Sequence, residues 1–526
     1  MKTAYYNGAV LTMKSRRCAQ AVLVENGRIL AVGSDDEILF QADTTVDLKG
    51  CCMLPGFIDP HSHITQLATT LDLVPLGSCT SNEALVQALR RALPQTKPGT
   101  WLIGFGYDNN SLPGKQHPDK HVLDAVSDTV PILISHASGH MGCVNSAALA
   151  AMGITNQTPD PAGGRIGRLE GSTEPSGYLE ENAFIQLAQG AAAPSAEQLF
   201  HAMHKAQQVY ASYGITTVQD GLTKQNEFAL LDALAQQHAL FLDIVAYPDM
   251  KEHASLLQAH PQYAGQYHNR LKLGGYKIFL DGSPQGRTAW LSQPYEKAED
   301  GYCGYPIYQD EQVLAFCERA VMEGRQLLAH CNGDAAAQQY IDAYAQALHR
   351  HPGVGRDLRP VMIHAQTLRR DQLPALKHLG MIPSFFLAHV YHWGETHVEN
   401  LGLSRAEAIS PAKSACQLGI PYTFHQDTPV IAPNMLETLW CAVNRKTKQG
   451  RILGAEERLD PYQVLCGITC HAAYQYFEEH DKGALAPGMR ADLVILDRNP
   501  CQVPPEELNQ LQVLCTIKDG TPVFQA

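Results

Sequence analysis

The sequence predicts an α/β fold in which a closed (β/α)8 TIM barrel is combined with a small β-sandwich built from both termini and an inserted subdomain. Strand-like apolar runs recur eight times between helix-length stretches, β-branched runs occupy both chain ends, and a long segment without this rhythm follows the first barrel strand. The chain has 526 residues, of which 45% are hydrophobic. It can therefore fill a large core, and it is neither a disordered tail nor a disulfide-stapled miniprotein.

Both chain ends carry the signals of short β-strands. Near the start, Asn26-Gly27 separates the apolar runs AVLVE and RILAVG, and this dipeptide is a strong β-hairpin signal. Near the end, Asp519-Gly520 stands between VLCTIK and TPVFQA in the same way. Neither end is large enough to fold alone, so we expect residues 1–55 and 480–526 to complete one β-sandwich. Two unrelated edge hairpins are the alternative.

Eight apolar runs predict the strands of the barrel. They cover residues 55–63, 214–220, 241–249, 271–283, 325–334, 359–367, 381–389 and 420–429. Stretches long enough for helices separate them, which is the pattern of a closed parallel barrel with its active site at the carboxyl ends of the strands. We expect the barrel to comprise residues 56–70 and 200–479. Residues 71–199 are too long for one strand-to-helix connection and are expected to form an inserted subdomain or lid.

Charge and cysteine content narrow the partners and the location. The 40 basic and 53 acidic residues give a formal net charge of −13, and no basic block stands out. We therefore expect a small-molecule substrate as partner, with no nucleic acid and no membrane. The 14 cysteines contain no C-x-x-C pair, and the chain start lacks an apolar stretch of signal-peptide length. The expectation is a cytoplasmic protein with free thiols, and a homodimer is the assembly considered.

Potential metal ligands stand at the ends of several predicted strands. His61 and His63 follow the first strand, and their spacing directs both side chains to the same side. Two imidazoles on one rigid segment suit a borderline metal such as zinc. His330, His364 and Asp427 occupy the corresponding place in three later strand-helix units, as convergent ligands must. Taken singly, each could instead be a structural histidine or a helix-capping aspartate.

Lys277 interrupts the apolar strand GGYKIFL. An unpaired lysine in such a strand is costly, and burial lowers the pKa of its amine toward the neutral form. A neutral amine can react with carbon dioxide, and the resulting carbamate is an anionic ligand able to bridge two cations. The alternative is a lysine that reaches solvent or pairs with Asp281.

These residues together resemble the amidohydrolase superfamily of metal-dependent hydrolases. LPGFIDPHSH resembles its opening signature, and the lysine, two histidines and aspartate follow in the family's order. The segment GALAPGMRADLVILD resembles the part that returns to the β-sandwich. More narrowly, KIFLDGSPQGRTA, GHMGCVNSAAL, AHCNGD and HQDTPV resemble the branch that includes N-substituted formamide deformylases and uncharacterised homologues. The resemblance runs nearly from end to end and implies the barrel with its terminal sandwich.

The resemblance also implies a ligand set and its division between two zinc ions. His61, His63 and Asp427 would hold the more buried ion, and two further histidines would hold the outer one. The complete metal set is His61, His63, Lys277, His330, His364 and Asp427. Lys277 would bridge the ions as an N6-carboxylated lysine. A single zinc on the first three residues is the alternative, with Lys277 left unmodified.

The expected function is zinc-dependent hydrolysis of a carbon-nitrogen bond other than a peptide bond, in an amide or formamide. A metal-bound hydroxide would attack the carbonyl, and Asp427 would act as general base and then general acid. Hydrolysis of cyclic amides, lactones or esters by the same centre is an alternative, because the metal centre does not set specificity. A deaminase is less favoured, because the residues after His330 lack the glutamate typical of those enzymes and Lys277 is present. A non-catalytic regulatory homologue is the third alternative.

Several aromatic and histidine residues are candidates for substrate binding. They are His140, Trp290, Tyr295, His389 and Trp393. Aromatic side chains near the barrel rim could form an apolar wall for a hydrophobic amide substituent. They could equally belong to the core of a lid.

Overall fold

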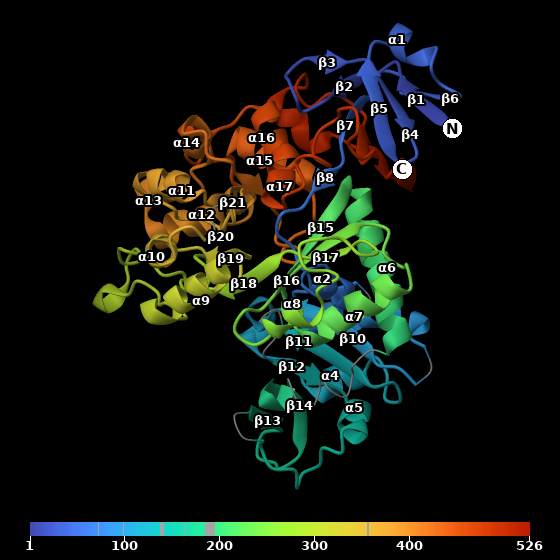
Figure 1. The fold of residues 1–526 in the computed structure, drawn as a ribbon. Coiled ribbons are helices and arrows are strands. Elements are labelled where there is room, and N and C mark those ends of the chain that lie inside the picture. Colours follow the sequence, from blue (N-terminus) through green and yellow to red (C-terminus); the bar gives the residue numbers. More distant parts are fainter. Residues whose placement is uncertain (72, 98, 137–140, 162–163, 185–194, 355–356) are drawn as a thin grey trace. The chain divides into compact units, whose positions relative to one another are not determined.

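The computed structural model describes residues 1–526 with the exception of 72, 98, 137–140, 162–163, 185–194 and 355–356. The chain divides into two compact units (Figure 1). The first contains residues 1–67 and 204–526, and the second contains residues 68–203. Among the described residues, no helix is both long enough and apolar enough to cross a membrane.

In the first unit, the two chain ends share one sheet. One sheet has the order β5-β4-β1-β6 and the other the order β25-β24-β23-β7-β2-β3. The strands are β1 Lys2–Tyr6, β2 Ala9–Leu11, β3 Cys18–Ala19, β4 Ala21–Glu25, β5 Arg28–Gly33, β6 Thr44–Asp47, β7 Cys52–Pro55, β23 Leu493–Leu496, β24 Val513–Lys518 and β25 Thr521–Gln525. β7 and β23 pair antiparallel, with Leu493 opposite Pro55. Buried side chains of both sheets, such as Val22, Met53 and Leu493, belong to one core cluster.

The two predicted hairpin turns are confirmed. Asn26 and Gly27 connect β4 to β5 with φ angles of 51° and 74°. Asp519 and Gly520 connect β24 to β25 with φ angles of 47° and 74°. The two-residue hairpin turn that matches the twist of its strands requires a positive φ angle at both central residues. Asparagine, aspartate and glycine adopt such angles most readily.

The remaining strands of the first unit are parallel and form two sheets, in the orders β17-β16-β15-β8 and β18-β19-β20-β21-β22. Their bounds are β8 Phe57–Ile58, β15 Ile215–Thr223, β16 Asp243–Pro248, β17 Leu271–Leu273, β18 Gly275–Phe279, β19 Gln326–Cys331, β20 Val361–His364, β21 Ile382–Phe385 and β22 Thr423–Phe424. Backbone hydrogen bonds also connect the two sheets. Met250 N–H, after β16, donates to Lys277 O of β18 (3.0 Å), and His63 N–H, after β8, donates to Thr428 O, after β22 (2.9 Å). The structure therefore brings the carboxyl ends of β8 and β22 together.

Several predicted strands differ from the structure. The run 55–63 contains only Phe57–Ile58 as a strand after the end of β7, and the run 420–429 only Thr423–Phe424. The run 271–283 is divided at Gly274 into β17, which pairs with β16, and β18, which pairs with β19. A Cβ atom at Gly274 would lie 2.5 Å from the Tyr247 ring, so the chain passes too close to that ring for any other residue. The run 381–389 is a strand only as far as Phe385, and a helix begins at His389.

Helices follow most of the parallel strands. Those of the first unit are α1 Asp35–Leu39, α2 Ile64–Thr70, α7 Gln225–Gln236, α8 Ser255–Ala259, α9 Asp310–Met322, α10 Asp334–Arg350, α11 Leu373–Leu379, α12 His389–Leu401, α13 Leu403–Glu407, α14 Ala412–Gln417, α15 Met435–Asn444, α16 Pro461–Gly467 and α17 Cys470–Gln475, and α6 Ala196–Ser212 links the two units. In α10, Ala336, Tyr340, Ala343 and Ala347 are buried at spacings of three and four residues. This spacing gives the helix one apolar face.

The second unit has a sheet and core of its own. The strand order is β13-β14-β12-β11-β10-β9. The elements are β9 Val74–Pro75, α3 Asn82–Ala92, β10 Leu102–Tyr107, α4 Lys120–Asp124, β11 Ile132–His136, β12 Met141–Val144, α5 Ser146–Ala151, β13 Gly164–Arg168 and β14 Pro175–Glu181. Ile132 and Ile134 pack with Leu85 of α3, whereas Leu133 packs with Leu149 of α5. Alternate strand residues thus face different helices, and the segment folds around its own core.

Candidate metal centre

The six predicted metal ligands stand on or after parallel strands of the first unit. They are His61 and His63 after β8, Lys277 in β18, His330 in β19, His364 at the end of β20 and Asp427 after β22. His61, His364 and Asp427 each offer one ligand atom, and these atoms all lie within 4.8 Å of one another. The spacing along the sequence is large, and it is the parallel pairing of the strands that brings these side chains together.

Asp427 is the meeting point of the two histidines of the first motif. Its Oδ1 lies 3.1 Å from Nε2 of His61 and 3.3 Å from Nε2 of His63. The other carboxylate oxygen, Oδ2, lies 4.0 Å from Nε2 of His364. The His61 side chain is 2% exposed and that of Asp427 is 15% exposed. The carboxylate therefore stands at the edge of a buried cluster that retains some access to solvent.

The opposite nitrogens of the two histidines show where their protons are. Nδ1 of His63 lies 2.7 Å from the Gly221 carbonyl oxygen, and Nδ1 of His61 lies 2.7 Å from Oε1 of Gln219. The amide of Gln219 is oriented by its own donation to the Pro60 carbonyl (2.7 Å), so both groups facing the rings are acceptors. In the neutral rings the proton is then on Nδ1, and the Nε2 lone pairs face the Asp427 carboxylate. Lone pairs and a carboxylate in this arrangement repel one another unless a cation lies among them.

His330 and His364 extend the cluster on its other side. Nε2 of His364 lies 3.1 Å from Nδ1 of His330. Nδ1 of His364 lies 3.1 Å from Nε2 of His425, which in turn contacts Ser384 Oγ through its Nδ1 (2.8 Å). The imidazole of His364 therefore has one nitrogen in the cluster and one supported from behind.

The charge states of these groups suit a metal ion. Burial, reinforced by the nearby amine of Lys277, lowers the pKa of His61 to about 4. Burial also lowers the pKa of His364 well below its usual value. Burial alone would raise the pKa of Asp427, but the surrounding histidines, His364 foremost, hold it well below its ordinary range. Neutral imidazoles with an ionised carboxylate are the donor set that zinc prefers in catalytic sites.

Lys277 is fully buried, and its Nζ has no hydrogen-bond partner among the described residues. Burial lowers the pKa of this amine to about 7, although Asp427 opposes the shift. Asp281 does not pair with it, because the Asp281 carboxylate accepts backbone N–H groups of Trp290 (2.9 Å), Asn332 (2.9 Å) and Gly333 (2.7 Å). A buried amine without a partner is costly, so this position points to a group that completes it.

The sequence interpretation missed the residues that support the ligands. Gln219 orients His61, and His425 supports His364. Each had a visible signal, because Gln219 interrupts the apolar run GITTVQD and His425 stands two residues before Asp427. A polar residue inside an otherwise apolar strand indicates a specific hydrogen-bond partner.

His389 lies close to the cluster. It begins α12 and is buried, and its ring centroid lies 4.5 Å from that of Phe386. The Phe386 ring lies 5.4 Å from that of His425. Trp393 packs on His389 with 4.5 Å between ring centroids. The two predicted substrate residues of this segment therefore form one aromatic group beside the cluster.

The other predicted substrate residues are placed differently. Tyr295 is buried in a core cluster with Leu291 and Val390, and its hydroxyl donates to the Ala289 carbonyl oxygen (2.8 Å). Trp290 is fixed through its backbone N–H, which donates to Asp281. His140 lies outside the described residues.

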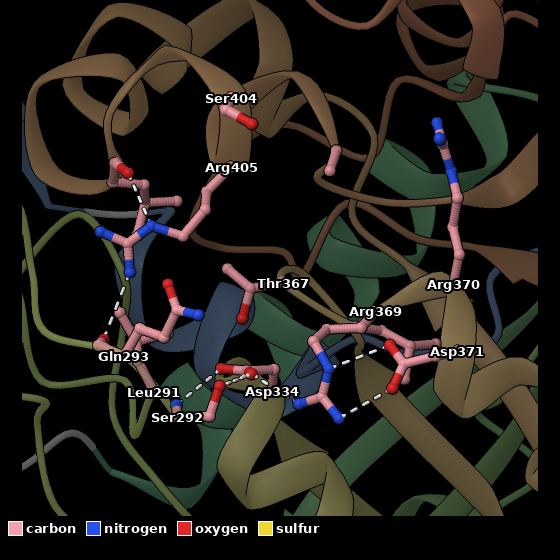
Figure 2. A pocket seen from close by; sticks show the side chains of 13 residues that line it. Leu291, Ser292, Gln293, Asp334, Thr367, Arg369, Arg370, Asp371, Ser404 and Arg405 are labelled. Atoms are coloured by element: carbon pink, nitrogen blue, oxygen red, sulfur yellow. Dashed lines mark hydrogen bonds and ion pairs between the residues drawn. The ribbon is translucent and has the colours of Figure 1, made fainter.

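A pocket of about 300 Å³ lies among the loops after β18 and β20 and the helices α12 and α13 (Figure 2). Its charged side chains already have partners, because Arg369 pairs with Asp334 (2.7 Å) and Asp371 (3.0 Å), and Arg405 donates to the Leu401 carbonyl (2.7 Å). Figure 2 shows Arg370 pointing away from Arg369. None of the six predicted ligands lines this pocket, so it is distinct from the histidine cluster.

Comparison with known proteins identifies similar sequences. A family model described as "Amidohydrolase family" matches residues 44–524. The chain is 28% identical over 543 residues to the N-substituted formamide deformylase of Arthrobacter pascens, covering 98% of this chain and 96% of that protein. It is also 27% identical over 409 residues to the exoenzymes regulatory protein AepA of Pectobacterium carotovorum subsp. carotovorum, covering 74% of this chain and 85% of that protein.

A solved structure has a similar fold. The crystal structure of an uncharacterized metal-dependent hydrolase from Pyrococcus horikoshii OT3 superimposes with a TM-score of 0.78 at 24% sequence identity. The match covers 96% of this chain and 99% of that one.

Proposed function

Because the chain belongs to the amidohydrolase family, whose model matches residues 44–524, we propose that it is a zinc-dependent hydrolase of a non-peptide carbon-nitrogen bond. The substrate class we propose is an N-substituted amide or formamide. The similarity to an N-substituted formamide deformylase along nearly the whole chain supports this class. The fold alone does not name a substrate, since specificity depends on the loops around the centre.

The observation that carries the proposal is the set of lone pairs that converge on Asp427. His61 and His63 each keep a proton on Nδ1 and turn Nε2 toward the same carboxylate oxygen. Together with the unpartnered amine of Lys277, this arrangement fits a bound cation and not a hydrogen-bonded apoprotein core.

The ligand roles follow from these contacts. His61, His63 and Asp427 would hold one ion, His330 and His364 a second, and Lys277 would bridge the two as an N6-carboxylated side chain. The bridging role is supported by the burial of Lys277 and by a pKa of about 7, which leaves much of the amine neutral at physiological pH. A single ion on the first three residues is the simpler form of the same centre.

The reaction would use the carboxylate of Asp427 as the proton carrier. When bound, zinc lowers the pKa of water to about 7 and polarises a carbonyl oxygen. Asp427 accepts a proton from the attacking water as the new carbon-oxygen bond forms, and it returns that proton to the leaving nitrogen as the carbon-nitrogen bond breaks. Its partial exposure and ionised state suit both steps. His389 and Trp393 would offer an apolar wall for the substrate, with His140, Trp290 and Tyr295 as further candidates.

Alternative activities share this centre. Hydrolysis of a cyclic amide, lactone or ester needs the same groups, whereas deamination is disfavoured by Lys277 and by the sequence after His330. The similarity to a regulatory protein supports the alternative of a homologue without turnover. We favour an enzyme because none of the six expected ligand positions is lost. The four histidines and Asp427 can bind zinc directly, and Lys277 would do so as a carboxylated side chain.

Further expectations on the fold, the location and the assembly belong to this proposal. The parallel strands would close into one barrel formed by residues 56–70 and 200–479, with residues 71–199 as an insert. Residues 1–55 and 480–526 would form a β-sandwich. The protein would act in the cytoplasm, as a homodimer.

The proposal is tested by assaying purified protein reconstituted with Zn²⁺ against N-substituted formamides, N-acyl amino acids and lactones. Turnover of a formamide or amide, lost in Asp427→Asn while the circular dichroism spectrum is unchanged, supports it. Turnover of lactones alone would replace the proposed substrate class. Absence of turnover on every class by fully zinc-loaded protein would favour the regulatory alternative.

A further inference from the structure

A second group of metal-binding side chains lies outside the histidine centre. It consists of Cys466, near the end of α16, and of Cys470 and His471, which begin α17. One ligand atom from each of the three residues lies within 4.8 Å of the others, and all three side chains are half-buried. Two thiols and an imidazole are ligands typical of structural zinc sites. No residue of the proposed catalytic centre takes part.

This Cys466-Cys470-His471 cluster is located at the amino end of β22. The ring of His471 contacts that of Tyr422, with 5.0 Å between centroids, and Tyr422 immediately precedes β22. Asp427 instead follows the carboxyl end of the same strand. In parallel α/β folds, catalytic groups gather at the carboxyl ends of the strands, so a metal ion at the amino end would have a structural role.

The imidazole of His471 is held in a form that can bind metal. Its Nδ1 lies 3.2 Å from the Tyr422 carbonyl oxygen, which can only accept a hydrogen bond. The proton is therefore on Nδ1, and Nε2 carries a lone pair. Metal-binding histidines usually donate their second nitrogen to a backbone carbonyl in this way.

The Cys470 thiol donates a hydrogen bond to the Cys466 carbonyl oxygen, with 3.7 Å between sulfur and oxygen. This contact holds the first residue of α17 against the end of α16. A divalent cation can replace both thiol protons and bind the two sulfurs as thiolates. None of the cysteines in the described structure is in a disulfide, so both sulfurs are available.

We propose that Cys466, Cys470 and His471 form a binding site for a thiophilic divalent cation of the Zn²⁺ class. Binding releases both thiol protons to solvent and joins the end of α16 to the start of α17. Cys416 does not belong to the cluster, and its sulfur accepts a hydrogen bond from Gln463 Nε2 (3.3 Å). We therefore expect water to be the fourth ligand of the tetrahedral ion.

Cobalt substitution tests this site separately from the catalytic centre. Co²⁺ bound by thiolates absorbs in the near ultraviolet by sulfur-to-metal charge transfer, and the six ligands proposed for the catalytic centre contain no sulfur. We expect reduced full-length protein titrated with Co²⁺ to develop this band. Cys466→Ser and Cys470→Ser should remove at least half of its intensity, and His471→Gln should shift the titration to higher Co²⁺ concentration. Cys416→Ser is the matched control and should leave the band unchanged.

The outcomes distinguish the alternatives. A band that depends on both cysteines of the cluster, with hydrolysis of the substrate unaffected in the zinc-loaded Cys470→Ser variant, supports the site. Absence of the band in wild-type protein whose thiols are shown to be free overturns it, as does a band that survives both serine substitutions. Peptide mass spectrometry that finds Cys466 and Cys470 linked by a disulfide, with no Co²⁺ band after reduction, would assign the pair to redox chemistry and also overturn it.

Discussion

Replacing Asp243 with asparagine should destabilise the first unit by about 3–5 kcal/mol. Asp243 begins β16, and its Oδ2 lies 2.6 Å from Nζ of Lys482 and 2.7 Å from Nζ of Lys518. The side chains of all three residues are at most 2% exposed. The carboxylate thus connects the start of β16 to Lys482, which precedes β23, and to Lys518 at the end of β24.

The magnitude depends on the partners that remain. Without the Asp243 charge, Lys482 keeps Glu478 (2.7 Å) and Lys518 keeps Asp492 (2.6 Å). Each lysine keeps one carboxylate partner. The free energy of unfolding should therefore fall by about 3 kcal/mol, the lower end of the range for removing one member of a buried ion pair.

The assay is urea unfolding at pH 7, followed by far-ultraviolet circular dichroism. Asp371→Asn is the matched control, because Asp371 is 71% exposed and pairs with Arg369 at the surface, where such a pair contributes at most about 1 kcal/mol. The reasoning is refuted if Asp243→Asn loses no more stability than this control.

The same substitution has a pH dependence of defined sign. Burial would raise the pKa of Asp243, but Lys482 and Lys518 outweigh it and hold the pKa well below the ordinary value. A lowered folded-state pKa gives stability that is present above the unfolded pKa of about 3.9 and is lost as the pH falls below it. The stability difference between wild type and Asp243→Asn should therefore be constant from about pH 5 to 7 and shrink toward pH 3.

Four further predictions concern the metal centre. Asp427→Asn should lower kcat at least about 100-fold with an unchanged circular dichroism spectrum, and an unchanged kcat would contradict its role as proton carrier. Lys277→Ala should lose zinc, measured by mass spectrometry of the metal, and regain part of it with bicarbonate and a short carboxylic acid; full zinc content without them would contradict the bridge. Gln219→Leu should weaken zinc affinity about 10- to 100-fold, because the proton on His61 Nδ1 loses its acceptor; equal affinity would show that Gln219 does not position the ring. Removing zinc with a chelator should abolish turnover and lower the urea midpoint. If free zinc was about 1,000-fold above its Kd beforehand, the free energy of unfolding should fall by about 4 kcal/mol. A urea midpoint that does not change on chelation would contradict metal binding to the folded state.

Much of the fold could be predicted because its signals are local. Asn26-Gly27 and Asp519-Gly520 determine their turns through their own backbone preferences, and the apolar runs give the strand positions. The division of residues 271–283 could not be predicted, because it depends on the close approach of Gly274 to the Tyr247 ring. Nothing near Gly274 in the sequence records that contact.

The candidate site also has features that the sequence predicts and features that depend on the fold. The positions of His61 and His63 follow from their spacing after a strand, whereas the acceptor for His61 comes from Gln219, 158 residues away. The pairing of β8 with β15 brings these two residues together, and that pairing is a property of the fold. The Cys466-Cys470-His471 cluster likewise depends on the turn between two short helices, which the spacing C-x-x-x-C-H alone does not specify.

The most direct test of the central claim is an anomalous difference map, collected above the zinc absorption edge from crystals grown with Zn²⁺. The account predicts a peak coordinated by Nε2 of His61, Nε2 of His63 and the carboxylate of Asp427. A zinc-loaded crystal without a peak there, or with those three side chains joined only by hydrogen bonds, would contradict the claim that they form the metal centre.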